Sequence, residues 1–196
     1  MSAPEPIHPL AAIARPGSHG AAGPRALRIE LPAREIVQVT ARRGREAELA
    51  QVLRAALGVE LPAAGFARGA GDVTAIWIQP GGWYLCAPRA GEGALAARIA
   101  ASCVGLAAVD DQSHGRTTLR VSGPAAREIL SRGVRVDLHP RAFGPGRATT
   151  TMAGHITCLV HQTDDSAYEL TVYSTLVATF FDWLVETAAE DGVVVG

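Results

Sequence analysis

The clearest structural pattern in the chain lies at residues 110–146, DDQSHGRTTLRVSGPAAREILSRGVRVDLHPRAFGPG. Apolar and polar residues alternate over 117–122, which predicts a half-buried strand. Gly123 ends that strand, and Pro124 suits the first position of a helix because proline has no amide hydrogen to leave unpaired there. A helix over 124–132 then carries a single apolar stripe. A strand that passes directly into a helix is a packing unit, and we expect the flanking elements to match it.

The residues before this stretch predict six elements in the order βαββαβ. They are a strand at 35–40, a helix at 44–57, strands at 73–79 and 83–87, a helix at 92–102 and a strand at 107–109. The two middle strands are joined by Pro80-Gly81-Gly82, which is typical of a tight hairpin. Residues 59–70 have no periodicity and predict a loop.

The residues after Gly146 complete a second set of the same kind. They predict a long β-prone run at 149–162 that is broken or bulged at Gly154, a strand at 168–173, a helix capped by Ser174, and a last strand at 193–195. We therefore predict an α+β fold made of two tandem split-βαβ, ferredoxin-like units, over residues 35–109 and 110–196.

Residues 1–34 are rich in proline, glycine and alanine and show no periodicity. They predict an irregular N-terminal arm that cannot bury enough area to fold alone. It is either a disordered tail or an arm that becomes ordered against a partner subunit, and the sequence leaves both open.

Composition excludes several classes of function. The chain has 18 Lys+Arg against 19 Asp+Glu, so no basic surface is predicted for nucleic acid or an anionic membrane. It contains no lysine, which excludes a lysine Schiff base and a P-loop lysine. No apolar run approaches the roughly 18 residues of a membrane span, and the N-terminus does not predict a signal peptide. Three widely spaced cysteines predict free thiols, so we expect a cytoplasmic protein.

Three patterns that could carry chemistry are each explained more simply. Gly91-Glu92-Gly93 resembles part of a dinucleotide motif, but Glu92 would place a carboxylate beside the phosphates. Adjacent residues of an extended segment point in opposite directions, so His114 is not expected to act as a base for Ser113. The six histidines lack the spacing of metal ligands. No catalytic, cofactor-binding or metal-binding residue is therefore predicted in this chain.

Two groups of residues are candidates for a subunit interface. Trp77 and Trp83 lie on one hairpin, where bulky aromatic side chains fill either a core or a subunit contact. Phe143 lies on a proline- and glycine-rich loop between Arg141 and Arg147, a composition typical of an interface anchor. The alternative is that Phe143 folds back over the helix at 124–132 and seals the core.

The stretch at 110–146, followed by ATTTMAGHITCLVHQ at 148–162, resembles the gamma subunit of heterotetrameric sarcosine oxidase. The matching motifs are the tract DQSHGR, Ser122-Gly123-Pro124, VDLHP with Phe143 and Thr151, Trp77 with GWYL at 82–85, and Phe181-x-Trp183-Leu184. The resemblance covers roughly residues 35–190. A more distant similarity is to the folate-binding domain of the glycine-cleavage T-protein, and it implies one folate-binding-type domain built from the two units.

The resemblance implies a complex that oxidatively demethylates sarcosine to glycine. Such a complex forms hydrogen peroxide and either formaldehyde or 5,10-methylenetetrahydrofolate. The family's alpha and beta subunits carry FAD, FMN and NAD, its delta subunit carries zinc, and tetrahydrofolate acts in the complex. This chain is then expected to be non-catalytic and to assist the assembly and stability of the large flavoprotein subunits, so whether it counts as an enzyme stays open.

Two alternatives stay open alongside this expectation. One is a stand-alone T-protein-like folate-binding protein of one-carbon metabolism. The other is the equivalent subunit of an N-methylglutamate-type dehydrogenase. The chain has Gly154-His155 where folate-binding relatives tend to place an acidic residue, and it lacks the lysine- and cysteine-centred motif of the other T-protein-like branch, so no folate-binding residue is predicted.

Overall fold

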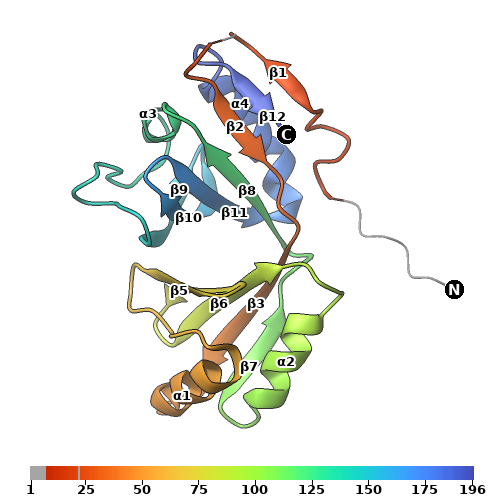
Figure 1. Cartoon of the computed structure of the whole chain (residues 1–196), viewed down its shortest axis with the longest axis vertical. Coiled ribbons are helices and arrows are strands. Elements are labelled where there is room, and N and C mark those ends of the chain that lie inside the picture. Colours follow the sequence, from red (N-terminus) through yellow and green to blue (C-terminus); the bar gives the residue numbers. More distant parts are fainter. Residues whose placement is uncertain (1–7, 22) are drawn as a thin grey trace, which may run out of the picture.

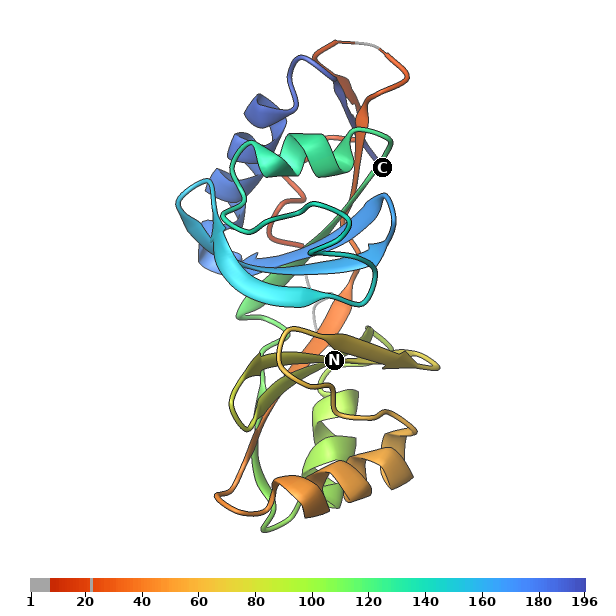
Figure 2. The ribbon, with the colours of Figure 1, turned by 90° about the vertical axis from the view of Figure 1, so that its left-hand side faces the viewer.

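The chain forms two β-sheets whose faces meet at the middle of the molecule, with helices on both outer faces (Figure 1). This arrangement is seen in a computed structural model that describes residues 8–21 and 23–196. From one end to the other, the layers are helices, the seven-stranded sheet, the five-stranded sheet and helices (Figure 2). The fold is α+β, with four α-helices in the described part of the chain.

The five-stranded sheet comes from the first half of the chain. Its elements are β3 (Arg34–Ala41), α1 (Glu46–Leu57), β4 (Ala67–Ala70), β5 (Val73–Gln79), β6 (Gly82–Pro88), α2 (Ala94–Ser102) and β7 (Ala107–Asp111). The strand order is β4-β5-β6-β3-β7, and all neighbours are antiparallel. The order β5-β6-β3-β7 is the one that a split βαβ unit requires.

Two details of this half differ from the prediction. Strand β4 lies in a segment predicted as loop, where it extends the β5–β6 hairpin by pairing with β5. Its sequence, ARGA, carries no strong strand signal, so its conformation is set by the neighbouring strand and not by its own residues. Strand β7 continues to Asp111, so the first unit ends two residues later than predicted.

The seven-stranded sheet contains most of the second half. Its elements are β8 (Arg116–Ser122), α3 (Ala126–Ser131), β9 (Ala148–Ala153), β10 (Ile156–Asp164), β11 (Ala167–Tyr173), a 3-10 turn η1 (Ser174–Leu176), α4 (Val177–Thr187) and β12 (Val193–Val195). The strand order is β1-β12-β2-β8-β11-β10-β9. Ser174 does not cap the helix as predicted; its Oγ lies 2.8 Å from Thr117 Oγ1.

The predicted run at 149–162 is a hairpin of two strands and not one interrupted strand. Gly154 and His155 form its two-residue turn and have φ values of 52° and 71°. Positive φ at both positions suits the right-handed twist of a hairpin, and a Cβ at Gly154 would collide with the ring of Trp183. The turn therefore needs glycine for both conformation and space.

The N-terminal stretch supplies two strands, β1 (Gly17–His19) and β2 (Leu27–Glu30), where we expected no regular structure. Strand β2 runs parallel to β12 and antiparallel to β8, and it lies between them. The second unit is therefore not self-contained within 110–196, which corrects the predicted boundaries. Four alternating residues between glycine- and proline-rich segments gave too short a pattern to predict β2. Residues 1–7 and 22 of the predicted arm lie outside the described residues.

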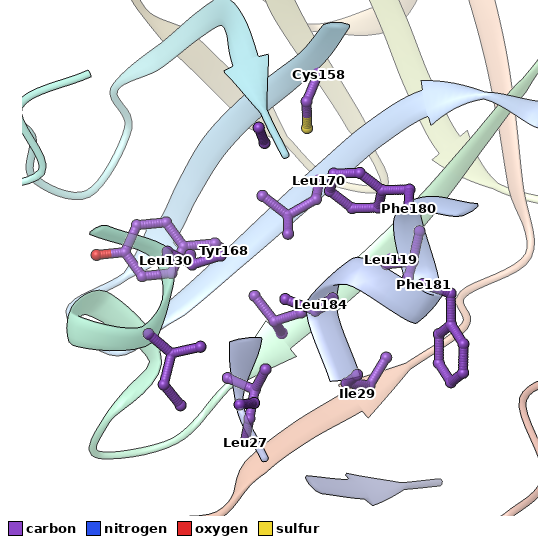
Figure 3. Close-up of a cluster of buried hydrophobic side chains, with 14 of the residues drawn as sticks. Leu27, Ile29, Leu119, Leu130, Cys158, Tyr168, Leu170, Phe180, Phe181 and Leu184 are labelled. Carbon is purple, nitrogen blue, oxygen red and sulfur yellow. The ribbon is translucent and has the colours of Figure 1, made fainter. Parts of the chain in front are cut away.

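Each sheet has its own helix-covered core. The larger core lies between the seven-stranded sheet and helices α3 and α4, where Leu170 of β11 packs near Phe180 and Leu184 of α4 (Figure 3). The smaller core lies between the five-stranded sheet and helices α1 and α2. A third apolar cluster joins the two sheets face to face. Its buried members are Ile36, Ala67, Ile76, Tyr84, Ala148 and Leu159.

Candidate functional site

The two tryptophans that were candidates for a subunit interface belong to the smaller core. Trp77 and Trp83 are cross-strand partners in the β5–β6 hairpin. Trp83 is 8% exposed, and its indole Nε1 donates a hydrogen bond to the carbonyl oxygen of Pro62, 3.0 Å away. Trp77 is half-buried and packs against the same cluster. Trp83 thus fills the core and satisfies its polar atom within the chain, which leaves little of it for a partner.

The predicted anchor Phe143 is also inside the molecule. Its side chain is 2% exposed and packs in the larger core, while Arg141 beside it is exposed. The loop is held by Arg127, whose Nη1 donates to the carbonyl oxygens of Leu138 and Phe143. An aromatic side chain with almost no exposed surface cannot anchor a partner while the chain keeps this fold. The anchor hypothesis is therefore wrong for Phe143 in this structure, and the alternative, in which Phe143 seals the core, holds.

Arg147 connects the two halves of the chain. Its guanidinium carbon lies 4.5 Å from the centroid of the Phe66 ring. The same two residues form an antiparallel β-bridge, next to hydrogen bonds from Ala67 N to Gly146 O and from Ala148 N to Gly65 O. The structure therefore brings Trp77 and Trp83 together, but it does not gather the five predicted interface residues on one surface.

A pocket that the sequence did not predict lies where the chain crosses between the two halves. It has a volume of about 340 Å³. The linker from β2 to β3 and the turn from β7 to β8 form part of its wall, together with the end of β6 and the start of η1. Its polar lining consists of Arg34, Arg89, Arg116, His8, His114, Ser113, Thr117, Thr118 and Ser174.

The three arginines of this pocket have different partners. Arg34 forms an ion pair with Glu169. Arg89 Nη2 donates to the carbonyl oxygen of Ser113, 3.3 Å away. The guanidinium of Arg116 lies 3.5 Å from the centroid of the Tyr173 ring, and its Nε is buried with no hydrogen-bond partner in the described part of the chain. Within residues 8–21 and 23–196, no carboxylate lies within 4.0 Å of Arg89 or Arg116.

Glu169 is a buried carboxylate between the sheets. Besides Arg34, it faces His161, whose Nδ1 lies 3.9 Å from Glu169 Oε2. Burial alone would raise the pKa of Glu169, but His161 and Arg34 together hold that pKa below its ordinary value. In the pocket itself, burial and the positive charge of Arg89 lower the pKa of His8, which favours its neutral form.

The serine and histidine that suggested a hydrolase are engaged in the structure. Ser113 Oγ donates to Asp111 Oδ1 at 2.5 Å and accepts a hydrogen bond from the backbone N–H of Ile36 at 3.0 Å. His114 Nε2 lies 3.4 Å from Glu92 Oε1. Ser113 thus satisfies the backbone donor of Ile36 where the strands meet.

The described residues contain no group of three His, Cys, Asp or Glu side chains placed to hold a metal ion. The three cysteines are free thiols, as predicted. Burial, together with the nearby carboxylate of Glu169, raises the pKa of the Cys86 thiol to about 12. A thiol that stays protonated at neutral pH is a poor nucleophile. None of the helices in the described ranges is both long and apolar enough to cross a membrane.

Comparison with known proteins gives consistent results. The model of a family described as "Sarcosine oxidase, gamma subunit family" matches residues 43–190. A sarcosine oxidase subunit gamma from Arthrobacter sp. is 34% identical over 140 residues, which cover 70% of this chain and 68% of the relative. A relative of the same description from Corynebacterium sp. (strain U-96) is 33% identical over 147 residues, with the same coverage.

Two solved structures are similar to this chain. A chain of the heterotetrameric sarcosine oxidase from Corynebacterium sp. U-96 has a TM-score of 0.81 and 28% identity, with 95% of this chain and 96% of that chain covered. The glycine cleavage system aminomethyltransferase T from Bartonella henselae has a TM-score of 0.63 and 12% identity, with 88% and 48% covered. The second similarity is one of fold.

Proposed function

The chain belongs to the sarcosine oxidase gamma subunit family, and we propose that it is the gamma subunit of a heterotetrameric sarcosine oxidase. The observation that carries this proposal is the similarity to a chain of such a complex over 95% of the present chain. The proposed complex contains alpha, beta and delta subunits as partners and acts in the cytoplasm. It demethylates sarcosine oxidatively to glycine, with hydrogen peroxide and formaldehyde or 5,10-methylenetetrahydrofolate as further products.

We propose that this subunit has no active site of its own and stabilises the assembly of its larger partners. Support comes from the side chains that could do chemistry, because Ser113 and His114 are held by neighbours and the Cys86 thiol is kept protonated. On this proposal FAD, FMN, NAD, zinc and tetrahydrofolate bind to the partner subunits.

The proposed fold family is the duplicated split-βαβ architecture of folate-binding domains. The strand order β5-β6-β3-β7 and the similarity to an aminomethyltransferase support it. In the seven-stranded sheet the order β8-β11-β10 corresponds to β3-β6-β5, with β2 inserted between β8 and β12. The insertion ties the N-terminal stretch to the second unit.

Co-expression with the three partner subunits tests the proposal. An affinity tag on this chain should capture all three, together with the absorbance of bound flavin and sarcosine-dependent production of hydrogen peroxide. The same tagged chain expressed alone is the control and should be colourless. Recovery of the chain without any partner from the co-expressing cells would overturn the proposal. A captured complex that oxidises N-methylglutamate and not sarcosine would assign it to the related dehydrogenase.

A further inference from the structure

The pocket between the two halves is built from segments that are locked to one another. Gln112 N donates to Ile36 O at 2.8 Å, and Ile36 N donates to Ser113 Oγ at 3.0 Å, so the β7–β8 turn is fixed against the start of β3. The β2–β3 linker and the β7–β8 turn, where the chain passes between its two halves, run close together in Figure 1. A volume of about 340 Å³ is within the size range of small-molecule sites, and the walls do not need to move to form it.

The lining of the pocket carries positive charge that the described residues do not neutralise. Glu169 compensates Arg34, but Arg89 and Arg116 have no carboxylate partner within residues 8–21 and 23–196. Arg116 Nε is a buried donor for which the described residues supply no hydrogen-bond partner.

The orientation of Arg116 is set before any ligand arrives. Its guanidinium lies 3.5 Å from the Tyr173 ring centroid and 5.7 Å from the Tyr84 ring centroid. The stacked planar group loses little freedom when it binds, and its parallel N–H groups match the two oxygens of a carboxylate or phosphate. Hydroxyl groups of Thr117 and Ser174 lie beside it, 2.8 Å from each other. Pro9, Pro32 and Ile36 supply an apolar wall.

We propose that this pocket binds the oxyanion group of a small organic acid or phosphate ester, with Arg89 and Arg116 as its direct partners. The apolar wall then contacts the carbon skeleton of the ligand, while the hydroxyl groups fix its orientation. The inference concerns binding to this chain alone and does not rest on the proposed oxidase function.

Calorimetric titration tests the site, with the full-length chain purified together with any partners it captures. The probes are succinate for the carboxylate class and glycerol phosphate for the phosphate class, with chloride at equal ionic strength as the blank. One class should bind once per chain and raise the melting temperature. Arg89→Gln and Arg116→Gln should each weaken that binding by about tenfold or more, because each removes a charged hydrogen-bond donor.

Arg68→Gln is the matched control, because Arg68 is an exposed arginine on β4 that does not line the pocket. It should leave binding unchanged. If Arg116→Gln does not fold, Arg89→Gln decides alone, since the only hydrogen bond of the Arg89 side chain to the described residues is the one to Ser113. The proposal is overturned if no probe binds above the chloride blank, or if Arg68→Gln weakens binding as much as the pocket variants.

Discussion

The guanidinium of Arg147 covers the ring of Phe66, 4.5 Å from its centroid, and this contact links an edge of the five-stranded sheet to an edge of the seven-stranded sheet. The residues are about 80 positions apart in sequence and come from different halves of the chain. Backbone hydrogen bonds of 2.8 and 3.0 Å flank the pair on both sides. The association of the two halves thus rests on β-type pairing at this edge as well as on the apolar cluster between the sheet faces.

The Phe66–Arg147 pair predicts a measurable coupling. Phe66→Leu and Arg147→Gln should each lower the free energy of unfolding, and the double variant should lose about 0.5–1 kcal/mol less than the sum of the two. Chemical denaturation of the four proteins gives this coupling. Val104→Ala, at a side chain that is 80% exposed, is the control and should change stability by less than about 0.5 kcal/mol. Strictly additive effects would show that the stacking contributes nothing.

Phe143→Ala should destabilise the subunit itself. Phe143 is 2% exposed, so the substitution removes buried apolar area and leaves a cavity, at a cost of about 3 kcal/mol or more. Its neighbour Arg141 is exposed, and Arg141→Ala should leave the unfolding midpoint nearly unchanged. Thermal unfolding of the two variants separates core from surface. A Phe143→Ala protein that melts like the parent but fails to join its partners would restore the anchor hypothesis.

Glu169 should make stability depend on acidity. Its pKa in the fold lies below the ordinary 4.5, so it binds protons more weakly when folded than when unfolded. Its contribution is therefore complete above about pH 4.5 and is lost as the pH falls through the lower, folded-state value. Glu169→Gln should lose about 3 kcal/mol at neutral pH, because Arg34 is left without its carboxylate, and should flatten this acid dependence.

The control for that experiment is Glu190→Gln, at an exposed carboxylate. Its unfolding free energy should follow that of the parent from pH 7 to pH 3. If the unfolding free energy of Glu169→Gln instead depends on pH as strongly as that of the parent, the Glu169 carboxylate is not the cause of that dependence.

The sequence predicted those helices and strands whose pattern of apolar, polar or turn residues is contained within one short segment. The alternation at 117–122 and the apolar stripe of the following helix correspond to β8 and α3, and Pro80-Gly81-Gly82 lies at the β5–β6 hairpin. Strand β2 escaped prediction because its pairing is decided by β8 and β12, which lie about 90 and 165 residues further along. Such pairing depends on partners that no local window contains.

The pocket escaped prediction for the same reason. Arg34, Arg89 and Arg116 come from three separate strands or strand ends, and each looks like an ordinary surface arginine in its own segment. The one available signal was the Asp111–Ser113 turn, whose polar residues fix the crossing between the halves. Phe143 shows a different limit of prediction from sequence. Its loop composition was equally compatible with an interface anchor and a core residue, and only the packing distinguishes the two.

The stabilising role in assembly can be tested by preparing the complex of the three partner subunits with and without this chain. The measurement is the rate at which flavin is released from the large subunits at a fixed elevated temperature. The proposed role predicts that omission of this chain either prevents isolation of the complex or accelerates flavin release several-fold, and that adding the purified chain back restores the slower rate. A three-subunit complex that forms in equal yield and retains its flavin equally long would contradict it.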